Sequence, residues 1–213
     1  MTTELYLITP PRLDDVAGFC DLLGQALDAG EIACLQLRLK DVDEETIKRA
    51  VEALLPVCHA RRVPLLLNDD PELAVATGCD GVHVGQDDMQ FRGARKLMGE
   101  NAMIGVTCKD SIPLALDAAD EGADYVAFGA FFPSATKDST TAASLETIEF
   151  WTQAMTVPCV AIGGITHENC GPLVAAGADF LAVIGGIWGH PEGPAAAVKA
   201  FEAAIAEHAP KED

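Results

Sequence analysis

Two aspartates that each follow a short apolar run could hold a metal ion between them. Asp69 and Asp88 stand just after the third and fourth such runs of the chain. Parallel strands end at one edge of a sheet, so neighbouring strands would bring the two carboxylates within reach of one cation. Mg²⁺ is bound by one or two carboxylates together with substrate phosphates and water, so the pair beside the basic residues that follow the second apolar run suggests a metal-bridged diphosphate. Helix capping is the alternative, and Asp70 and Asp87 are equally well placed for it.

A group with two cations comes after the second apolar run. The chain carries 14 basic residues against 33 acidic ones, a formal net charge of −19, so each basic residue is worth locating. Gln36, Arg38 and Lys40 alternate with leucines and would face one side of a strand, provided the chain stays extended this far. Arginine offers a fork for phosphate oxygens and lysine a point charge. A salt bridge to Asp41 or Asp43 is the alternative, and spacing alone does not decide.

Glycine pairs follow the last two apolar runs. They are Gly163–Gly164 and Gly185–Gly186, and the first pair precedes a helix that Thr166 is expected to cap. In parallel barrels, phosphate sites often use the loops after strands seven and eight, where backbone N–H groups and a helix N-terminus meet the anion. Simple turn geometry is the alternative explanation for each pair.

A long segment without strand signals adds two hydroxyls and a cation. These are Ser134, Thr136 and Lys137, in a loop that runs from residue 129 to about residue 142. A loop of this length could act as a lid over a site. An ordinary polar loop has the same composition.

Other reactive residue types are better explained by packing. His83 lies between two valines and is expected to be a hydrogen-bonded core histidine rather than a catalyst. The seven cysteines show no Cys-x-x-Cys pair, so reduced thiols packed as small hydrophobes are expected rather than a metal or disulfide framework. The sequence shows no Ser/His/Asp or Cys/His arrangement for nucleophilic catalysis.

The elements that must position these residues alternate regularly. Apolar runs typical of buried strands lie at residues 5–9, 33–38, 63–67, 81–85, 103–107, 125–128, 157–162 and 180–184. Each is followed by a helical pattern, and the last helix is expected from residue 195 to about residue 208. Gly78, Gly122 and Gly177 each end a helix two residues before an aspartate and a strand. Eight such units predict an α/β fold, a (β/α)₈ TIM barrel with its active site at the carboxyl ends of the strands. A flavodoxin-like or Rossmann sheet needs fewer units and a glycine-rich first turn, where Pro10–Pro11 stands instead.

Length and composition limit the classes of protein. The 213 residues predict a single domain, 1–213, with residues 209–213 as a frayed tail. No apolar run reaches about 18 residues and no basic segment precedes an apolar one at the start, so a cytoplasmic protein without a membrane span is expected. The strong negative charge argues against nucleic acid and anionic membranes as partners. The expected partners are small-molecule substrates. The sequence does not decide whether the chain forms a homo-oligomer.

Taken together, these residues resemble the thiamine-phosphate synthase family. The resemblance rests on the order of residues 36–40, 68–69, 81–88, 122–125, 133–137 and 161–166, and it extends from Leu5 to Trp188. The family condenses hydroxymethylpyrimidine diphosphate with a thiazole phosphate, giving thiamine phosphate and diphosphate. It uses Mg²⁺ and a (β/α)₈ barrel, so the resemblance implies a Mg²⁺-dependent transferase.

The resemblance also implies roles at the matching positions. Asp69 and Asp88 would hold Mg²⁺, and Gln36 would contact the pyrimidine. Thr107 stands where the family usually has a serine near the reacting centre. The diphosphate would be held by Arg38, Lys40, Asn68 and Lys137. The catalytic set would be Arg38, Lys40, Thr107 and Lys137. The thiazole phosphate would be held by Ser134, Thr136, Gly164, Ile184 and Gly185.

Two departures from the family pattern keep alternatives open. A histidine-bearing run is typical after strand five, where this chain has Thr107 and Cys108, and the related thiazole tautomerases depend on that histidine. At strand eight, Gly185 replaces the family's serine. The alternatives are an isomerase or tautomerase-like phosphate-binding barrel, which would need an acid/base pair at the mouth, and a non-catalytic binder of thiamine precursors.

Overall fold

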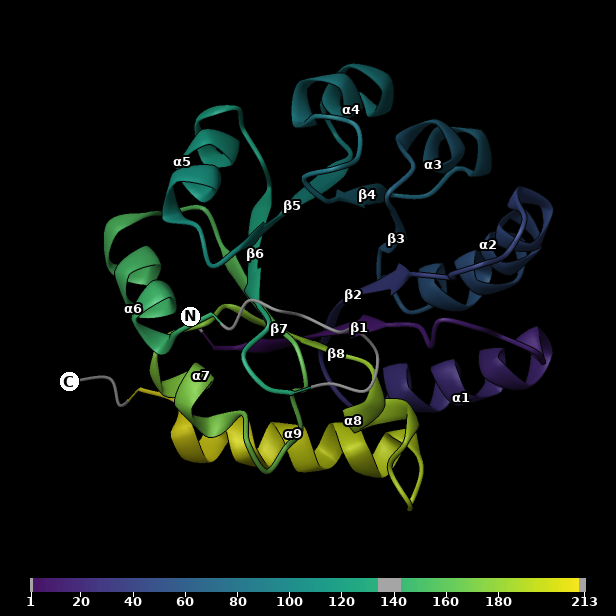
Figure 1. The fold of residues 1–213 in the computed structure, drawn as a ribbon. Coiled ribbons are helices and arrows are strands. Elements are labelled where there is room, and N and C mark those ends of the chain that lie inside the picture. Colours follow the sequence, from purple (N-terminus) through teal and green to yellow (C-terminus); the bar gives the residue numbers. More distant parts are fainter. Residues whose placement is uncertain (1, 134–142, 211–213) are drawn as a thin grey trace.

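Eight parallel strands close into a barrel in which each strand pairs with the next and β8 pairs with β1 (Figure 1). The computed structural model describes residues 2–133 and 143–210. The strands are β1 Glu4–Ile8, β2 Ile32–Leu37, β3 Leu65–Asn68, β4 Gly81–Val84, β5 Met103–Lys109, β6 Tyr125–Gly129, β7 Cys159–Ile162 and β8 Phe180–Val183. The predicted (β/α)₈ barrel is confirmed.

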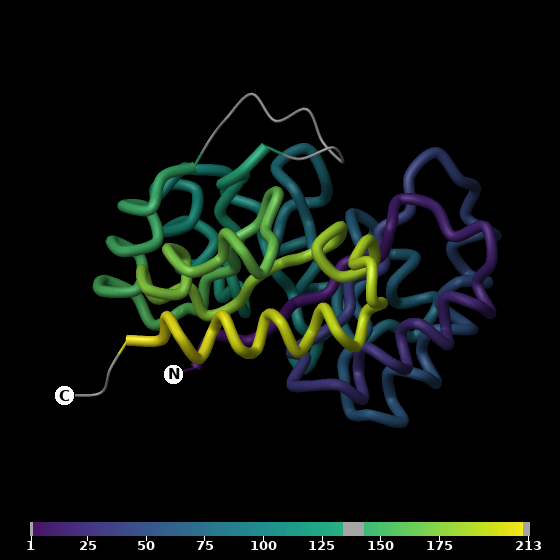
Figure 2. The backbone as a smooth tube through the Cα atoms, turned by 90° about the horizontal axis from the view of Figure 1, so that it is seen from below, coloured from purple at the N-terminus to yellow at the C-terminus, as the bar shows by residue number. Residues whose placement is uncertain are grey.

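The helices form a ring around the barrel (Figure 1). They are α1 Val16–Ala29, α2 Glu44–His59, α3 Pro71–Thr77, α4 Phe91–Met98, α5 Ile112–Asp120, α6 Leu145–Ala154, α7 Gly171–Ala175, α8 Gly185–Trp188 and α9 Pro194–His208. The described residues thus contain nine helices rather than the expected eight, because the short α8 separates β8 from α9. In the view from below, α9 lies in front of the barrel (Figure 2). None of these helices is long and apolar enough to cross a membrane within the described ranges.

Side chains cap several helices as the sequence indicates. Asp43 accepts the Thr46 N–H at the start of α2, and Asp70 accepts the Leu73 N–H at the start of α3, at 2.8 and 2.9 Å. The expectation that Thr166 caps the next helix is wrong. Residues 166–169 instead form a turn, and α7 begins at Gly171, just before Pro172. Proline favours the first turn of a helix, where backbone N–H groups have no acceptor within the helix and the loss of one N–H costs little. Pro172 therefore explains why the helix starts later than expected.

Two apolar layers make up the core. One lies between the strands and the surrounding helices, and the other fills the barrel interior. The interior layer contains Tyr6, Ile8, Cys34, Leu66, Tyr125, Ala127, Val160 and Ala182. Alternate residues of a strand face the same side, so the next inward positions at the carboxyl ends are Gln36 on β2, Asn68 on β3 and Thr107 on β5. The barrel therefore directs three predicted site residues to one mouth.

Three aspartates join pairs of strands at the opposite end of the barrel. The carboxylates of Asp80, Asp124 and Asp179 accept the backbone N–H groups of Leu65, Ile104 and Cys159 at 2.8, 2.7 and 2.8 Å. Each aspartate precedes an even-numbered strand and binds the first residues of the odd-numbered strand before it. The sequence predicted that the glycine two residues before each of these aspartates ends a helix, but it did not predict the role of the aspartate.

Replacing Asp179 by alanine is expected to lower the free energy of unfolding by about 1–3 kcal/mol, because the buried Cys159 N–H loses its acceptor. Urea unfolding followed by circular dichroism measures the change. The exposed Asp117 provides a control, since its alanine variant should stay within about 0.5 kcal/mol of wild type. Equal effects of the two substitutions would show that the hydrogen bond to Cys159 contributes nothing.

Candidate active site

Polar side chains from β2 and β3 meet at the carboxyl end of the barrel. Nε2 of Gln36 donates to Oδ1 of Asn68 at 2.8 Å, and Gln36 is only 2% exposed. Nζ of Lys40 lies 2.9 Å from Oδ2 of Asp69, and these two side chains are 42% and 38% exposed. The structure therefore brings these four predicted site residues together, with the amides deeper in the barrel and the charges near solvent.

The chain does not stay extended as far as Lys40. β2 ends at Leu37, and the backbone N–H of Lys40 donates to the carbonyl of Pro11 instead of continuing the sheet. The assumption that Gln36, Arg38 and Lys40 share one strand face is therefore wrong for the last two residues. Lys40 nevertheless reaches Asp69 from the loop.

Arg38 is half-buried beside this group. Its backbone N–H donates to Oγ1 of Thr9 at 2.9 Å. Across the described part of the chain, no carboxylate pairs with the Arg38 guanidinium. The alternative salt bridge from Lys40 to Asp41 or Asp43 does not form, since Lys40 pairs with Asp69 and Asp43 caps α2. A cation that no described carboxylate neutralises suits the binding of an anionic ligand.

Asp69 sits in a strained backbone conformation. Its φ is 70°, in the left-handed region that non-glycine residues seldom adopt, and its N–H donates to the His83 carbonyl at 2.8 Å. Such strain costs about 1–3 kcal/mol and is concentrated at functional sites. The next residue, Asp70, caps α3, so the two neighbouring carboxylates have different partners.

Asp69 and Asp88 lie next to each other, as their positions after adjacent strands predict. Burial raises the pKa of Asp88 above its ordinary value, and the Asp69 carboxylate raises that pKa further. The Gly85 N–H, which donates to Oδ2 of Asp88 at 2.7 Å, opposes this shift. Asp87 does not cap α4, whose N-cap is Gln90. Two facing carboxylates in a partly buried site are the surroundings that a divalent cation would stabilise.

The donor set fits Mg²⁺ held jointly with a substrate. Within residues 2–133 and 143–210, no three His, Cys, Asp or Glu side chains are grouped so as to hold a metal ion. Mg²⁺ commonly keeps several waters and takes only one or two carboxylates, with substrate phosphates completing its shell. The Asp69–Asp88 pair beside Lys40 therefore fits a magnesium diphosphate better than a metal site made of protein alone.

Thr107 lies on β5 at the mouth. Its Oγ1 is 2.7 Å from Nε2 of His83, and its carbonyl accepts a hydrogen bond from Nε2 of Gln86 at 2.7 Å. The other ring nitrogen of His83 is 2.9 Å from the Tyr125 hydroxyl. The expectation of a hydrogen-bonded core histidine is confirmed. The sequence interpretation missed Tyr125 because it stands among apolar residues.

The glycines after β7 and β8 differ in their surroundings. Gly164 has a φ of 63°, and a Cβ there would collide with the Pro133 carbonyl oxygen, so close backbone approach requires glycine. Gly185 begins α8, and a Cβ there would meet no atom within 4 Å. Ile184 stands at the N-cap of the same helix. The remaining predicted contacts of this region, Ser134, Thr136 and Lys137, lie outside the described residues.

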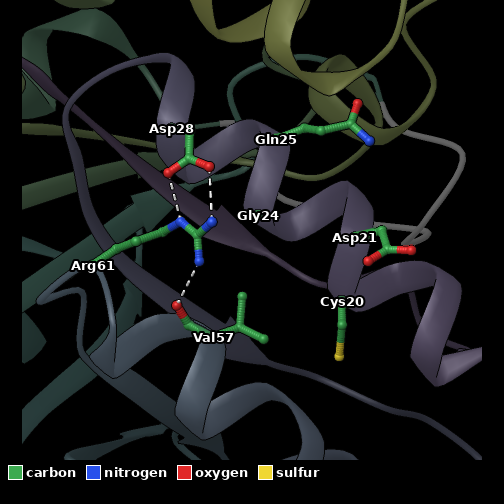
Figure 3. Close-up of a pocket in the computed structure, with 7 residues that line it drawn as sticks. All are labelled: Cys20, Asp21, Gly24, Gln25, Asp28, Val57 and Arg61. Carbon is green, nitrogen blue, oxygen red and sulfur yellow. Dashed lines mark hydrogen bonds and ion pairs between the residues drawn. The ribbon is translucent and has the colours of Figure 1, made fainter.

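A separate cavity of about 510 Å³ lies outside the barrel, between α1 and α2 (Figure 3). Arg61 forms a two-pronged ion pair with Asp28 there, at 2.7 and 2.8 Å, and Cys20 and Gln25 line the same hollow. None of the predicted site residues contributes to it. This cavity is therefore separate from the candidate active site at the mouth of the barrel.

Comparisons with known proteins agree with the geometry of the mouth. The family described as thiamine monophosphate synthase matches residues 5–187. A thiamine-phosphate synthase of Rhodospirillum centenum is 60% identical over 198 residues, covering 93% of this chain and 95% of that protein. One of Hyphomonas neptunium is 51% identical over 205 residues, covering 94% and 93%. The solved structure of a thiamine phosphate pyrophosphorylase from Pyrococcus furiosus is similar with a TM-score of 0.82 at 28% identity, over 96% of both chains. The chain belongs to the thiamine monophosphate synthase family.

Proposed function

We propose that this mouth condenses hydroxymethylpyrimidine diphosphate with a thiazole phosphate, giving thiamine phosphate and diphosphate. The observation that carries the proposal is the Asp69–Asp88 carboxylate pair beside Lys40, at the ends of neighbouring strands. It supplies both the metal ligands and the cation that a diphosphate leaving group needs. Family membership over residues 5–187 supports the same reaction.

The chemistry requires little acid–base machinery. The C–O bond to the diphosphate breaks with its electron pair going to the leaving oxygen, and the electron-rich aminopyrimidine stabilises the cation formed. The thiazole nitrogen then uses its lone pair to form the new C–N bond. The protein must therefore neutralise the leaving group, exclude water and position the nitrogen. No group is needed to remove a proton from that nitrogen, which agrees with the mouth as built.

Each predicted residue takes a part of this task. Mg²⁺, when bound by Asp69 and Asp88, supplies positive charge to the diphosphate oxygens. Lys40 exchanges its ion pair with Asp69 for the diphosphate, which Arg38 and Asn68 also contact. Gln36 contacts the pyrimidine, and the Thr107 hydroxyl faces the reacting centre. Lys137 joins the diphosphate contacts, and the thiazole phosphate is held by Ser134, Thr136, Gly164, Ile184 and Gly185.

We place this enzyme in the cytoplasm as a single domain over residues 1–213. All seven cysteines are free thiols and six of them are buried, a state that suits a reducing compartment. The isomerase alternative is not favoured, because the chain is up to 60% identical to proteins named thiamine-phosphate synthase over most of its length. His83, one of its candidate acid/base groups, is also engaged at both ring nitrogens inside the barrel. The binder alternative conflicts with a mouth that keeps the groups for the leaving diphosphate.

The direct experiment supplies purified protein with both substrates and Mg²⁺ and measures release of diphosphate and formation of thiamine phosphate. Release that stops in EDTA and returns with added Mg²⁺ is expected. No release by the wild-type protein would contradict the proposal. Turnover of one phosphorylated substrate alone in EDTA would favour the isomerase.

Substituting serine for Gly185 is expected to lower the KM for the thiazole phosphate by about threefold to tenfold, through one added hydroxyl hydrogen bond. The open space around Gly185 accommodates the side chain. The neighbouring Gly186→Ser is the matched control and should destabilise the fold, because its Cβ would lie 2.8 Å from the Ile165 carbonyl. An unchanged KM in the stable Gly185→Ser variant would place the phosphate elsewhere.

A further inference from the structure

A chain of hydrogen-bonded side chains crosses the barrel interior and ends at the mouth. The Tyr6 hydroxyl is 2.8 Å from the Tyr125 hydroxyl, which is 2.9 Å from Nδ1 of His83. Nε2 of the same imidazole is 2.7 Å from Oγ1 of Thr107. These four residues, the interior chain, come from β1, β6, β4 and β5. A path of hydrogen bonds therefore links the middle of the barrel to a residue of the proposed site.

The register of the sheet makes room for the interior chain. Gly105 on β5 pairs with His83 on one side and with Tyr125 on the other. A Cβ on Gly105 would collide with the Tyr125 ring, so only glycine leaves space for that ring. The His83 and Tyr125 rings are stacked with centroids 5.6 Å apart, and Tyr6 meets Tyr125 edge-on at 5.7 Å. Packing therefore holds the rings of the interior chain in one arrangement.

Burial fixes the protonation of the two phenols. Tyr6, Tyr125 and His83 are 3%, 4% and 8% exposed, where barrels more often hold branched apolar side chains. Burial raises the pKa of both tyrosines well above their ordinary value, so each hydroxyl keeps its hydrogen. A buried polar group is costly unless its hydrogen bonds are made, so these hydrogens must be arranged consistently along the interior chain.

The arrangement of these hydrogens decides what Thr107 can do. If Tyr125 donates to Nδ1, His83 carries its hydrogen on Nε2 and donates to Oγ1 of Thr107. The hydroxyl hydrogen of Thr107 is then left to point at a ligand. In the opposite arrangement Thr107 donates to His83 and can only accept from a ligand. Donors aimed at developing negative charge are the ones that accelerate loss of a leaving group.

We propose that the interior chain directs the Thr107 hydroxyl hydrogen toward the substrate, so that His83 and Tyr125 are positioning residues that act through Thr107. The inference rests on the proposed function, because it takes Thr107 to face the reacting centre. A purely structural role is the competing explanation. Under it, losing a link of the interior chain would lower stability or activity whether or not Thr107 has a hydroxyl.

A double-mutant cycle separates the two explanations. Tyr125→Phe removes one hydroxyl and keeps the ring, so kcat is expected to fall about tenfold with both KM values within about twofold of wild type. Thr107→Val removes the hydroxyl at the mouth and should lower kcat about a hundredfold. In the Thr107→Val background, adding Tyr125→Phe should change kcat by less than about twofold, because residue 107 then has no hydroxyl for the interior chain to orient. Thr107→Ser keeps the hydroxyl and should retain most of the activity.

Controls keep the outcome decisive. Thr3→Val also removes a buried hydroxyl, which donates to the Ala178 carbonyl at 2.8 Å. Thr3 precedes β1 at the amino ends of the strands and has no hydrogen bond to the interior chain, so the kcat of this variant should stay at the wild-type value. Tyr6→Phe breaks the next link and replaces Tyr125→Phe in the cycle if that variant does not fold. If Tyr125→Phe lowered kcat equally with threonine and with valine at position 107, this inference would be overturned while the proposed function would stand. Full activity of Thr107→Val would have the same consequence. A wild-type protein that releases no diphosphate would overturn the proposed function and this inference together.

Discussion

Asp69→Ala is expected to reduce diphosphate release about a thousandfold while lowering the free energy of unfolding by about 2 kcal/mol or less, because alanine fits the left-handed backbone less well than aspartate. Asp69 supplies one of the two carboxylates that we propose hold Mg²⁺. Its ion pair with Lys40 is partly exposed, and such pairs contribute about 0–1 kcal/mol. Steady-state release of diphosphate at several Mg²⁺ concentrations, together with urea unfolding, measures both quantities.

The neighbouring Asp70 is the matched control. Asp70→Ala removes the cap of α3 and should cost about 1 kcal/mol of stability with activity within about twofold of wild type. Asp69→Asn isolates the charge, because asparagine tolerates the left-handed backbone at φ 70° and keeps the shape of the side chain. An active Asp69→Asn, or equal activity losses at the two neighbouring positions, would show that the Asp69 charge is not needed.

The barrel was predictable from local patterns, because both faces of its strands are covered. Continuous apolar runs such as residues 65–67, each followed by polar residues and a helical pattern, mark buried parallel strands. The positions of Asp69 and Asp88 followed from adjacency of β3 and β4 alone. Their roles as metal ligands, like those of the other site residues, stay predictions until a substrate complex or the variants above test them.

Short turns and contacts between distant residues were the features that the pattern of the sequence did not reveal. Thr166 is a residue type that often caps helices, but it lies in a turn with Asn169, and the helix begins only at Gly171, just before Pro172. The two glycines that begin α8 are typical of a turn, and a helix of only four residues is too short to produce a helical pattern in the sequence. Tyr6 and Tyr125 are separated by 119 positions, and only the closed register brings their hydroxyls together. The aspartates before β4, β6 and β8 did recur in the sequence, and their recurrence could have indicated a shared structural task.

Gly105→Ala is expected to lower the free energy of unfolding by about 3 kcal/mol or more, and the melting temperature by roughly 10 °C. The added methyl group would collide with three atoms of the Tyr125 ring, which is itself held by His83 and Tyr6. The ring cannot move without breaking hydrogen bonds of the interior chain, and the strand cannot move without disturbing its pairing with β4 and β6. Thermal unfolding followed by circular dichroism measures the loss.

The same substitution at Gly185 separates this clash from a general cost of changing glycine. A Cβ at Gly185 meets nothing within 4 Å, so Gly185→Ala should unfold within about 1 kcal/mol of wild type. Replacing Tyr125 by leucine removes the ring that the added methyl group would strike, so the penalty of Gly105→Ala should shrink to about 1 kcal/mol in that background. A penalty that stays unchanged beside leucine would mean that the interior chain does not require glycine at this position, and that the strand itself resists the methyl group.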